Sequence, residues 1–252
     1  MTTFTADDLV LLYKKMTARA TAHCRLTTSL VGGISADRAG IEAFVRHQLK
    51  LEGDAAEQAV NRILKDEIGE HNVTPAEGEV QERLSYGVKV LRRDAFGPWL
   101  GDWMVKACIK TAGSRLGYFK TKLGSKGAMV EAGQVRAIDG SLAEQQGEFD
   151  PPRRVHFYDG TTGQAVQTAF EQIKGRISSP AGAASIVTDC ETVPAGSRFS
   201  FEYRWFGDSK LKTNDIANIF ALAMVIGVGS AKAFERGKFR VEKLEVEEYR
   251  AA

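Results

Sequence analysis

Cysteine, histidine and proline are all scarce in this chain of 252 residues, which has 3 cysteines, 4 histidines and 6 prolines. Cys24, Cys108 and Cys190 are far apart and odd in number. That spacing fits neither a zinc site nor a disulfide framework, and it favours a reducing compartment. We therefore expect a cytoplasmic protein that uses no metal and no cofactor.

An excess of one charge and a long apolar run are absent too. With 34 basic and 32 acidic side chains the net charge is only +2, so nucleic-acid affinity would have to come from local patches. No apolar stretch approaches the roughly 18 residues of a membrane span, and the N-terminus lacks the basic-then-apolar order of a signal peptide. The sequence predicts no membrane partner.

What the chain does have is enough apolar residues for a core, at 43% of the total. Periodicity predicts a first strand over residues 20–30 and a helical pattern over 38–70, divided at Gly53 and Asp54. Residues 81–91 are predicted to form a strand or a short helix. A turn at Gly97 and Pro98 then precedes a helix whose apolar face is formed by Met104, Ala107, Cys108, Ala112 and Leu116.

The second half is predicted to be mostly strands. Residues 118–153, rich in glycine, lysine and polar side chains, suggest an inserted, flexible region. Further expected elements are a strand over 154–158, a helix or strand over 166–175, two strands paired with each other over 185–193 and 198–205, and a helix capped by Thr213 or Asn214. A final strand over 239–246 slips its alternation at Glu242 and Lys243, which predicts a bulge.

Gly227 and Gly229 begin a glycine-containing basic loop between the last helix and the last strand. A dinucleotide fingerprint would need a third glycine at Lys232 and would leave a strand to open a helix, which is the reverse of the order here. A P-loop would need Ser or Thr at Phe239. The loop is instead suited to present backbone amides and cations to an extended anion.

Four segments of the chain form a recognisable set: residues 23–33, residues 96–113, the strand VPAGSRFSFEYRW, and the loop and strand IGVGSAKAFERGKFRVEKLEV. Together they resemble the RAMP superfamily of CRISPR-associated proteins. The resemblance implies an α+β, ferredoxin-like (RRM-like) antiparallel sheet with helices on one face, forming a single domain over 1–252 with a central insertion. The chain looks most like the backbone subunit that polymerises along a guide RNA. Its implied partners are single-stranded guide RNA and copies of itself.

In such a fold the natural phosphate partners are the cations near glycine-rich segments. We predict that the RNA-binding residues are Lys106, Lys110, Arg115, Lys120, Lys122, Lys126, Gly227, Gly229, Lys232, Arg236 and Lys238. Each of these cations, taken alone, is also compatible with an ordinary position on the protein surface. Two groups of aromatic residues have alternative interpretations. Phe199, Phe201 and Tyr203 share one strand face and belong either to the core or to a base-stacking platform. Trp99 and Trp103 lie at a helix start and either pack in the core or stack on a base or on a neighbouring subunit.

Catalysis has only weak candidates, His23 and Asp37. His23 is more simply a structural residue, and Asp37 is more simply a helix cap. We therefore expect a non-catalytic RNA-binding scaffold subunit. Two alternatives remain: an endoribonuclease of the same fold that processes guide RNA, and a structural assembly protein of a phage or mobile element that works without RNA.

Overall fold

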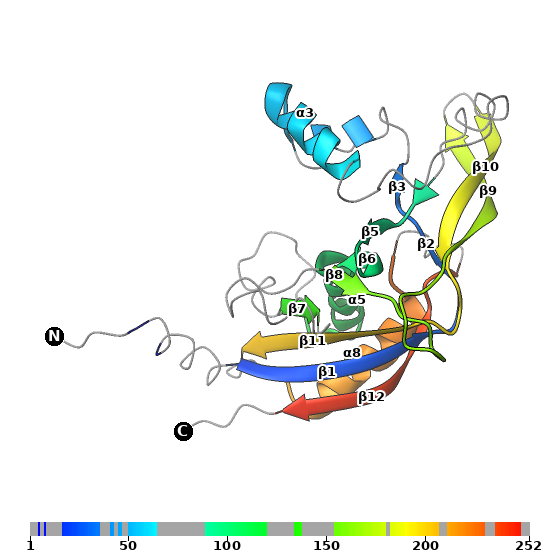
Figure 1. Ribbon diagram of the computed structural model, residues 1–252. Helices are drawn as coiled ribbons and strands as arrows, with labels where there is room; N and C mark the ends of the chain where they lie inside the picture. The colour runs from blue at the N-terminus through cyan, green and yellow to red at the C-terminus, as the bar shows by residue number, and fades with distance from the viewer. Residues whose placement is uncertain are drawn as a thin grey trace.

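The computed structural model of the chain is shown in Figure 1 and describes residues 5, 8, 17–35, 41–42, 45–46, 50–64, 89–119, 134–137, 154–179, 182–206, 211–229 and 235–247. None of the helices within these ranges is long and apolar enough to span a membrane.

A 4-stranded antiparallel sheet forms the centre of the molecule, in the order β12-β1-β11-β7. β1 (Thr17–Leu26) is flanked by β12 (Phe239–Glu247) and β11 (Arg198–Phe206). The short strand β7 (Gln134–Ala137) pairs with the other side of β11. β7 lies inside the segment 118–153, in which we expected an insertion.

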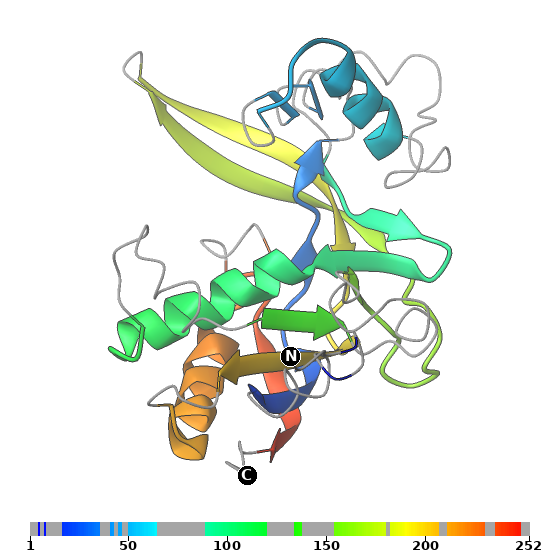
Figure 2. The ribbon, with the colours of Figure 1, turned by 90° about the vertical axis from the view of Figure 1, so that its left-hand side faces the viewer.

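Two helices lie side by side on one face of this sheet (Figure 2). α5 (Asp102–Arg115) comes between β1 and β7 along the chain, and α8 (Thr213–Ile226) comes between β11 and β12. Strand, helix, two strands, helix, strand, with the last strand beside the first, is the ferredoxin-like arrangement. The predicted fold is therefore confirmed, and residues 27–101 with β2 to β6 form a large connection between β1 and α5.

Alternation along the central strands explains why the helices cover one face. Ala20, Ala22 and Cys24 of β1 are buried, as are Phe199, Phe201, Tyr203 and Trp205 of β11. The Phe201 ring stacks on Phe220 of α8 with centroids 5.9 Å apart. The aromatic face of the 198–205 strand thus belongs to the core, and its stacking-platform alternative is wrong.

Two further sheets, one 5-stranded and one 3-stranded, are built onto this core. β9 (Ala169–Ser179) and β10 (Gly182–Val193) form a long antiparallel hairpin that projects from the body (Figure 1). β10 also pairs with β2 (Leu30–Val31) and β4 (Lys89–Val90), and β4 pairs with β3 (Ile34–Ser35). β5 (Arg92–Asp94), β6 (Gly97–Gly101) and β8 (Arg154–His156) make the third sheet, which leads directly into α5.

The expected pairing of strand 185–193 with strand 198–205 is wrong. Both strands exist, but β10 pairs with β9 and β11 pairs with β1. The turn between them bonds to the end of β1 instead: Gly196 N–H donates to the Leu26 carbonyl and Leu26 N–H donates to the Ser197 carbonyl, each at 2.8 Å. These bonds direct the two strands into different sheets. The first strand accordingly ends at Leu26, earlier than predicted.

The structure also tests several local predictions. The bulge is confirmed, because β12 pairs Val241 with Cys24 and Lys243 with His23, which leaves Glu242 as the extra residue. The helical pattern does divide near Gly53, where α3 (Gly53–Arg62) begins, and the segment 166–175 contributes to a strand, β9.

Two predictions about helices need correction: the apolar face of α5 and the capping residue of α8. The buried face of α5 is formed by Val105, Cys108, Ile109 and Ala112, while Leu116 is 40% exposed, so the face is rotated from the predicted one because the helix packs on α8 as well as the sheet. α8 is capped from Lys212, whose N–H donates to the Asp215 carboxylate at 2.9 Å, rather than by Thr213 or Asn214.

Candidate nucleic-acid interface

Lys106 and Lys110 lie four residues apart on α5 and therefore share one side of the helix. Both are half-buried. Burial lowers the pKa of Lys106; the Asp102 carboxylate opposes that shift, and the charge on Lys110 adds to it. Two neighbouring ammonium groups that are partly withdrawn from water favour the approach of an anion. Arg115, the third predicted cation of α5, is exposed in its last turn.

Trp103 belongs to the same side of the helix, three residues before Lys106. It is 47% exposed, whereas Trp99 is 4% exposed. The two tryptophans, for which the sequence suggested the same alternatives, thus differ in burial. Trp99 packs inside the protein, and Trp103 presents an indole to solvent beside two of the predicted cations.

Two arginines that sequence reasoning missed also contact these indoles. The Arg92 guanidinium carbon lies 5.4 Å from the Trp99 ring centroid and 5.1 Å from that of Trp103, and Arg154 lies 5.0 Å from Trp99. These are cation–π distances. The hairpin that joins β5 to β6 creates the arrangement, because it places Arg92 directly opposite Trp99. The sequence signal was the tight turn at Ala95 and Phe96, which was overlooked.

Asp94 anchors this group from the hairpin end. Its carboxylate accepts hydrogen bonds from Arg154 at 2.9 Å, from the buried His156 ring at 2.9 Å and from the Phe96 N–H at 2.9 Å. Burial alone would raise the pKa of Asp94, but the bonds from His156, Arg154 and Phe96 lower it below its ordinary value. An ionised Asp94 therefore holds Arg154 against Trp99.

The C-terminal loop uses its glycines for its own packing. Gly227 and Gly229 have φ of 78° and 88°, in the left-handed region that favours glycine. A Cβ on Gly227 would lie 2.9 Å from the Gly237 carbonyl oxygen, and Val228 N–H donates to that same oxygen at 2.8 Å. These contacts let the end of α8 approach the start of β12. Contact of either glycine with a phosphate stays a prediction.

The two described cations of that loop contact carboxylates. Arg236 pairs with Glu171 of β9 at 2.9 Å, and Lys238 pairs with the exposed Glu235 at 3.2 Å. Both pairs are accessible to water, so each is worth little and a phosphate could compete for the cation. The structure thus groups the described predicted cations into an α5 set and a loop set. Lys120, Lys122, Lys126, Lys232 and Asp37 lie outside the described residues.

His23 lies on the other side of the central sheet from α5, since it alternates with Ala22 and Cys24, which face the helices. Its Nδ1 is 3.0 Å from the Ser200 hydroxyl, and Lys243 is its neighbour on β12. Ion pairs surround it, including Arg25 to Glu242 at 2.8 Å. The candidate catalytic histidine and the α5 cations therefore lie on opposite faces. Within the described ranges there is no cluster of three or more potential metal ligands.

Comparison with known proteins finds structural neighbours only: no family model and no curated protein matches the sequence. The chain is similar to one in type III-B Cmr-beta bound to cognate target RNA, with TM-score 0.39 and 13% identity over 97% of this chain and 66% of that one. It is also similar to Cmr6 from Pyrococcus furiosus (TM-score 0.35, 10% identity, 89% of this chain and 98% of that one). A chain of a type IV-B CRISPR complex is a third neighbour (TM-score 0.36, 10% identity, 91% and 90%). At such identities the likeness to these three chains concerns the fold.

Proposed function

We propose that this chain is a non-catalytic RNA-binding scaffold subunit of a CRISPR-type or related ribonucleoprotein, and that copies of it assemble along single-stranded guide RNA. The observation that carries the RNA-binding part is the side of α5 where Lys106 and Lys110 lie beside the exposed Trp103. Cations next to an open aromatic ring match a strand whose phosphates and unpaired bases are both accessible. The CRISPR context follows from the four sequence segments that resemble the RAMP superfamily.

Self-assembly is supported by the shape of the molecule. The β9–β10 hairpin, with strands of 11 and 12 residues, extends well beyond the central sheet (Figures 1 and 2). A projecting arm of that length can reach a neighbouring copy when several copies are arranged along one strand. The RNA then sets the spacing of the copies, so assembly depends on RNA.

The particle mass of the purified chain, measured before and after nuclease treatment, tests this function. RNA-dependent assembly predicts large particles with a high ratio of absorbance at 260 to 280 nm, and smaller, nucleic-acid-free particles after digestion. Ordered assemblies that survive nuclease and high salt would instead favour the protein-only assembly. Protein that carries no RNA and binds none at about 50 mM salt, where phosphate contacts are strong, would refute the proposal.

The proposal also holds that bound RNA is not cut. Hairpin and single-stranded RNA incubated with the chain, with and without divalent cations, should migrate unchanged on a denaturing gel. Metal-independent cleavage that is lost in His23→Ala would establish the endoribonuclease alternative, because a histidine is the general acid or base that such chemistry needs.

A further inference from the structure

Four side chains from β5, β6, β8 and the start of α5 form an alternating stack of guanidinium groups and indoles, in the order Arg154, Trp99, Arg92, Trp103. Successive guanidinium carbons and ring centroids are 5.0, 5.4 and 5.1 Å apart. Each contact lies within the range of a cation–π interaction. We call this group the Arg–Trp stack.

Strand register places the inner part of the stack on one face of the β5–β6–β8 sheet. Arg92 is opposite Trp99, Trp99 is opposite His156, and Arg154 is opposite Gly101, so all of them share a face. The neighbouring residues Leu100 and Val155 point the other way, into the main core. The stack is therefore anchored on a sheet whose reverse side is packed.

Gly101 makes room for the last member of the stack. A Cβ at this position would collide with the six-membered ring of Trp103, although the backbone there, with φ −67° and ψ 140°, is open to any residue. The indole of Trp103 therefore lies across the Gly101 backbone. Space for the ring, and not backbone conformation, is what Gly101 supplies.

The stack ends at an exposed ring. Trp99 is 4% exposed and contacts the guanidinium groups of Arg92 and Arg154, whereas Trp103 contacts Arg92 and is 47% exposed. An indole that is held in place and still half-open to solvent can accept a further planar group. The stack is thus ordered at its buried end and open at its outer end.

The charge next to this ring identifies the kind of planar group. Lys106 and Lys110 follow Trp103 at helical spacing, and burial together with the Lys110 charge lowers the pKa of Lys106 against the opposing effect of Asp102. An anion bound between the two lysines would stabilise their charged forms and so counteract this lowering of the Lys106 pKa. A nucleotide in a single strand combines the two requirements, because it has a flat base and phosphates on either side.

We propose that Trp103 is a stacking platform for one unpaired nucleobase of single-stranded RNA, with Lys106 and Lys110 at the adjacent phosphates. This inference rests on the proposed function, since it takes RNA as the ligand, and it adds that a base plane as well as the backbone is bound. Arg92 acts as a positioning residue, because its guanidinium group contacts the Trp103 ring.

Fluorescence anisotropy with a labelled oligoadenylate of about 15 nucleotides tests the inference. Trp103→Ala should weaken binding by about 5- to 150-fold, the loss that corresponds to one base stacked on an aromatic ring. Its salt dependence should equal that of the wild type, because every cation remains. Trp103→Phe should restore most of the affinity, since it keeps an aromatic face.

Gly101→Ala offers an independent variant that keeps the tryptophan. It should weaken binding as Trp103→Ala does, because the new Cβ displaces the ring. Leu116→Ala, which shortens another exposed apolar side chain directly after α5, is the matched control and should bind as the wild type does. Circular dichroism melts verify that each variant is folded.

A strand of the same length whose sugars carry no bases separates stacking from phosphate contact. It should bind the wild type and Trp103→Ala equally. Wild-type RNA binding that Trp103→Ala leaves unchanged would overturn the stacking inference alone, while the proposed function would stand. If Trp103→Ala lost a contact with another protein while its RNA binding stayed intact, the stacking inference would also be overturned, because Trp103 would then bind a protein. No RNA binding by the wild type would overturn both.

Discussion

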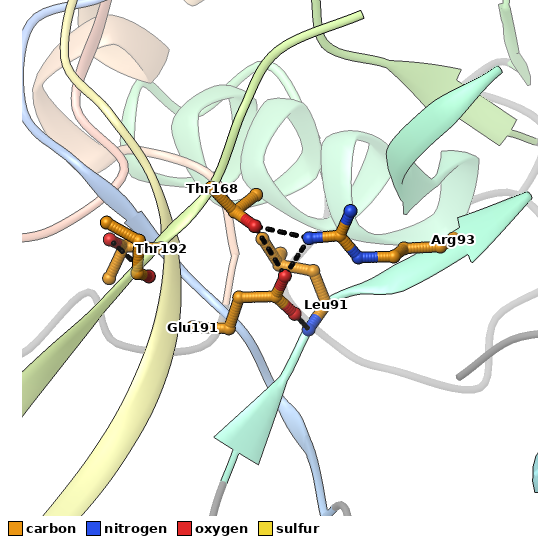
Figure 3. Close-up of polar contacts among 6 residues, drawn as sticks. Leu91, Arg93, Thr168, Glu191 and Thr192 are labelled. Atoms are coloured by element: carbon orange, nitrogen blue, oxygen red, sulfur yellow. Dashed lines mark hydrogen bonds and ion pairs between the residues drawn. The ribbon is translucent and has the colours of Figure 1, made fainter. Parts of the chain in front are cut away.

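Replacing Glu191 with glutamine is expected to weaken the junction that holds the β9–β10 hairpin to the rest of the chain. Glu191 lies on β10 and is 1% exposed. Its carboxylate accepts the Leu91 N–H at 2.8 Å, the Thr168 hydroxyl at 2.6 Å and a guanidinium N–H of Arg93, as Figure 3 shows. The buried Glu191 side chain thus connects β10 to Thr168, directly before β9, to Leu91, directly before β5, and to Arg93 within β5.

The size of the loss follows from these contacts. Glutamine has one acceptor oxygen, so an NH₂ group must face either the Leu91 N–H or the Arg93 and Thr168 donors. A lost hydrogen bond to a buried charged group costs about 1.5–3 kcal/mol. The broken pair with Arg93 adds less, since the Arg93 side chain is 29% exposed and water screens its charge. We expect a total of about 3 kcal/mol, which lowers the melting temperature by roughly 6–12 °C for a chain of this size.

Calorimetric melting and urea unfolding measure this loss, and Glu171→Gln is the matched control. Glu171 lies on the adjacent strand and pairs with Arg236 at 2.9 Å, but its side chain is 37% exposed. The control should therefore lose less than about 1 kcal/mol. Equal unfolding free energies for the two variants would refute the reasoning that burial makes the Glu191 contacts valuable.

Three further stability predictions use the same measurements. Phe220→Ala should lower the free energy of unfolding in urea by about 3–5 kcal/mol, because the Phe220 ring is buried. Val225→Ala on the same helix, where the side chain is 63% exposed, should change this free energy by no more than about 0.5 kcal/mol. Equal losses for the two variants would contradict the burial assignment. Gly163→Ala should cost about 1–2 kcal/mol from its φ of 70°. Gly237 also has a φ of 70°, and Gly237→Ala should have a lower melting temperature than Gly163→Ala. A Cβ at position 237 would collide with a backbone carbonyl, whereas a Cβ at position 163 would have no neighbouring atom within 4 Å. Asp94→Asn should lower the free energy of unfolding by its full amount near neutral pH and by progressively less below about pH 4, because the folded-state pKa of Asp94 is held below its ordinary value. A loss that does not depend on pH would argue against this.

Local pattern was enough to predict β1, β11 and β12 of the central sheet, but not β7, which lies in the segment where we expected a flexible insertion. Alternation in 198–205 and 239–246, and the helix before Gly227, gave β11, α8 and β12 nearly at their observed bounds, and even the bulge at Glu242. Strand pairing was harder, because adjacent strands in a chain usually pair, and here the bonds from Gly196 and Ser197 to Leu26 separate them.

The site was predicted only in part, for a physical reason. Helical spacing alone placed Lys106 and Lys110 together outside the apolar face of α5. Arg154 lies more than fifty positions away from Trp99 in the sequence and reaches it only through the β6–β8 pairing, which no local pattern encodes. The different exposure of Trp99 and Trp103 likewise depends on what packs around each ring.

The salt dependence of RNA binding tests the central claim most directly. Lys106→Ala with Lys110→Ala should flatten the slope of log affinity against log salt by about 1.4, because each phosphate contact on a single strand contributes about 0.7. Arg240→Ala with Lys243→Ala removes the same charge from exposed positions of β12 and should leave the slope unchanged. Equal slopes for the wild type and the Lys106 and Lys110 double variant would contradict the assignment of α5 as the RNA-binding surface.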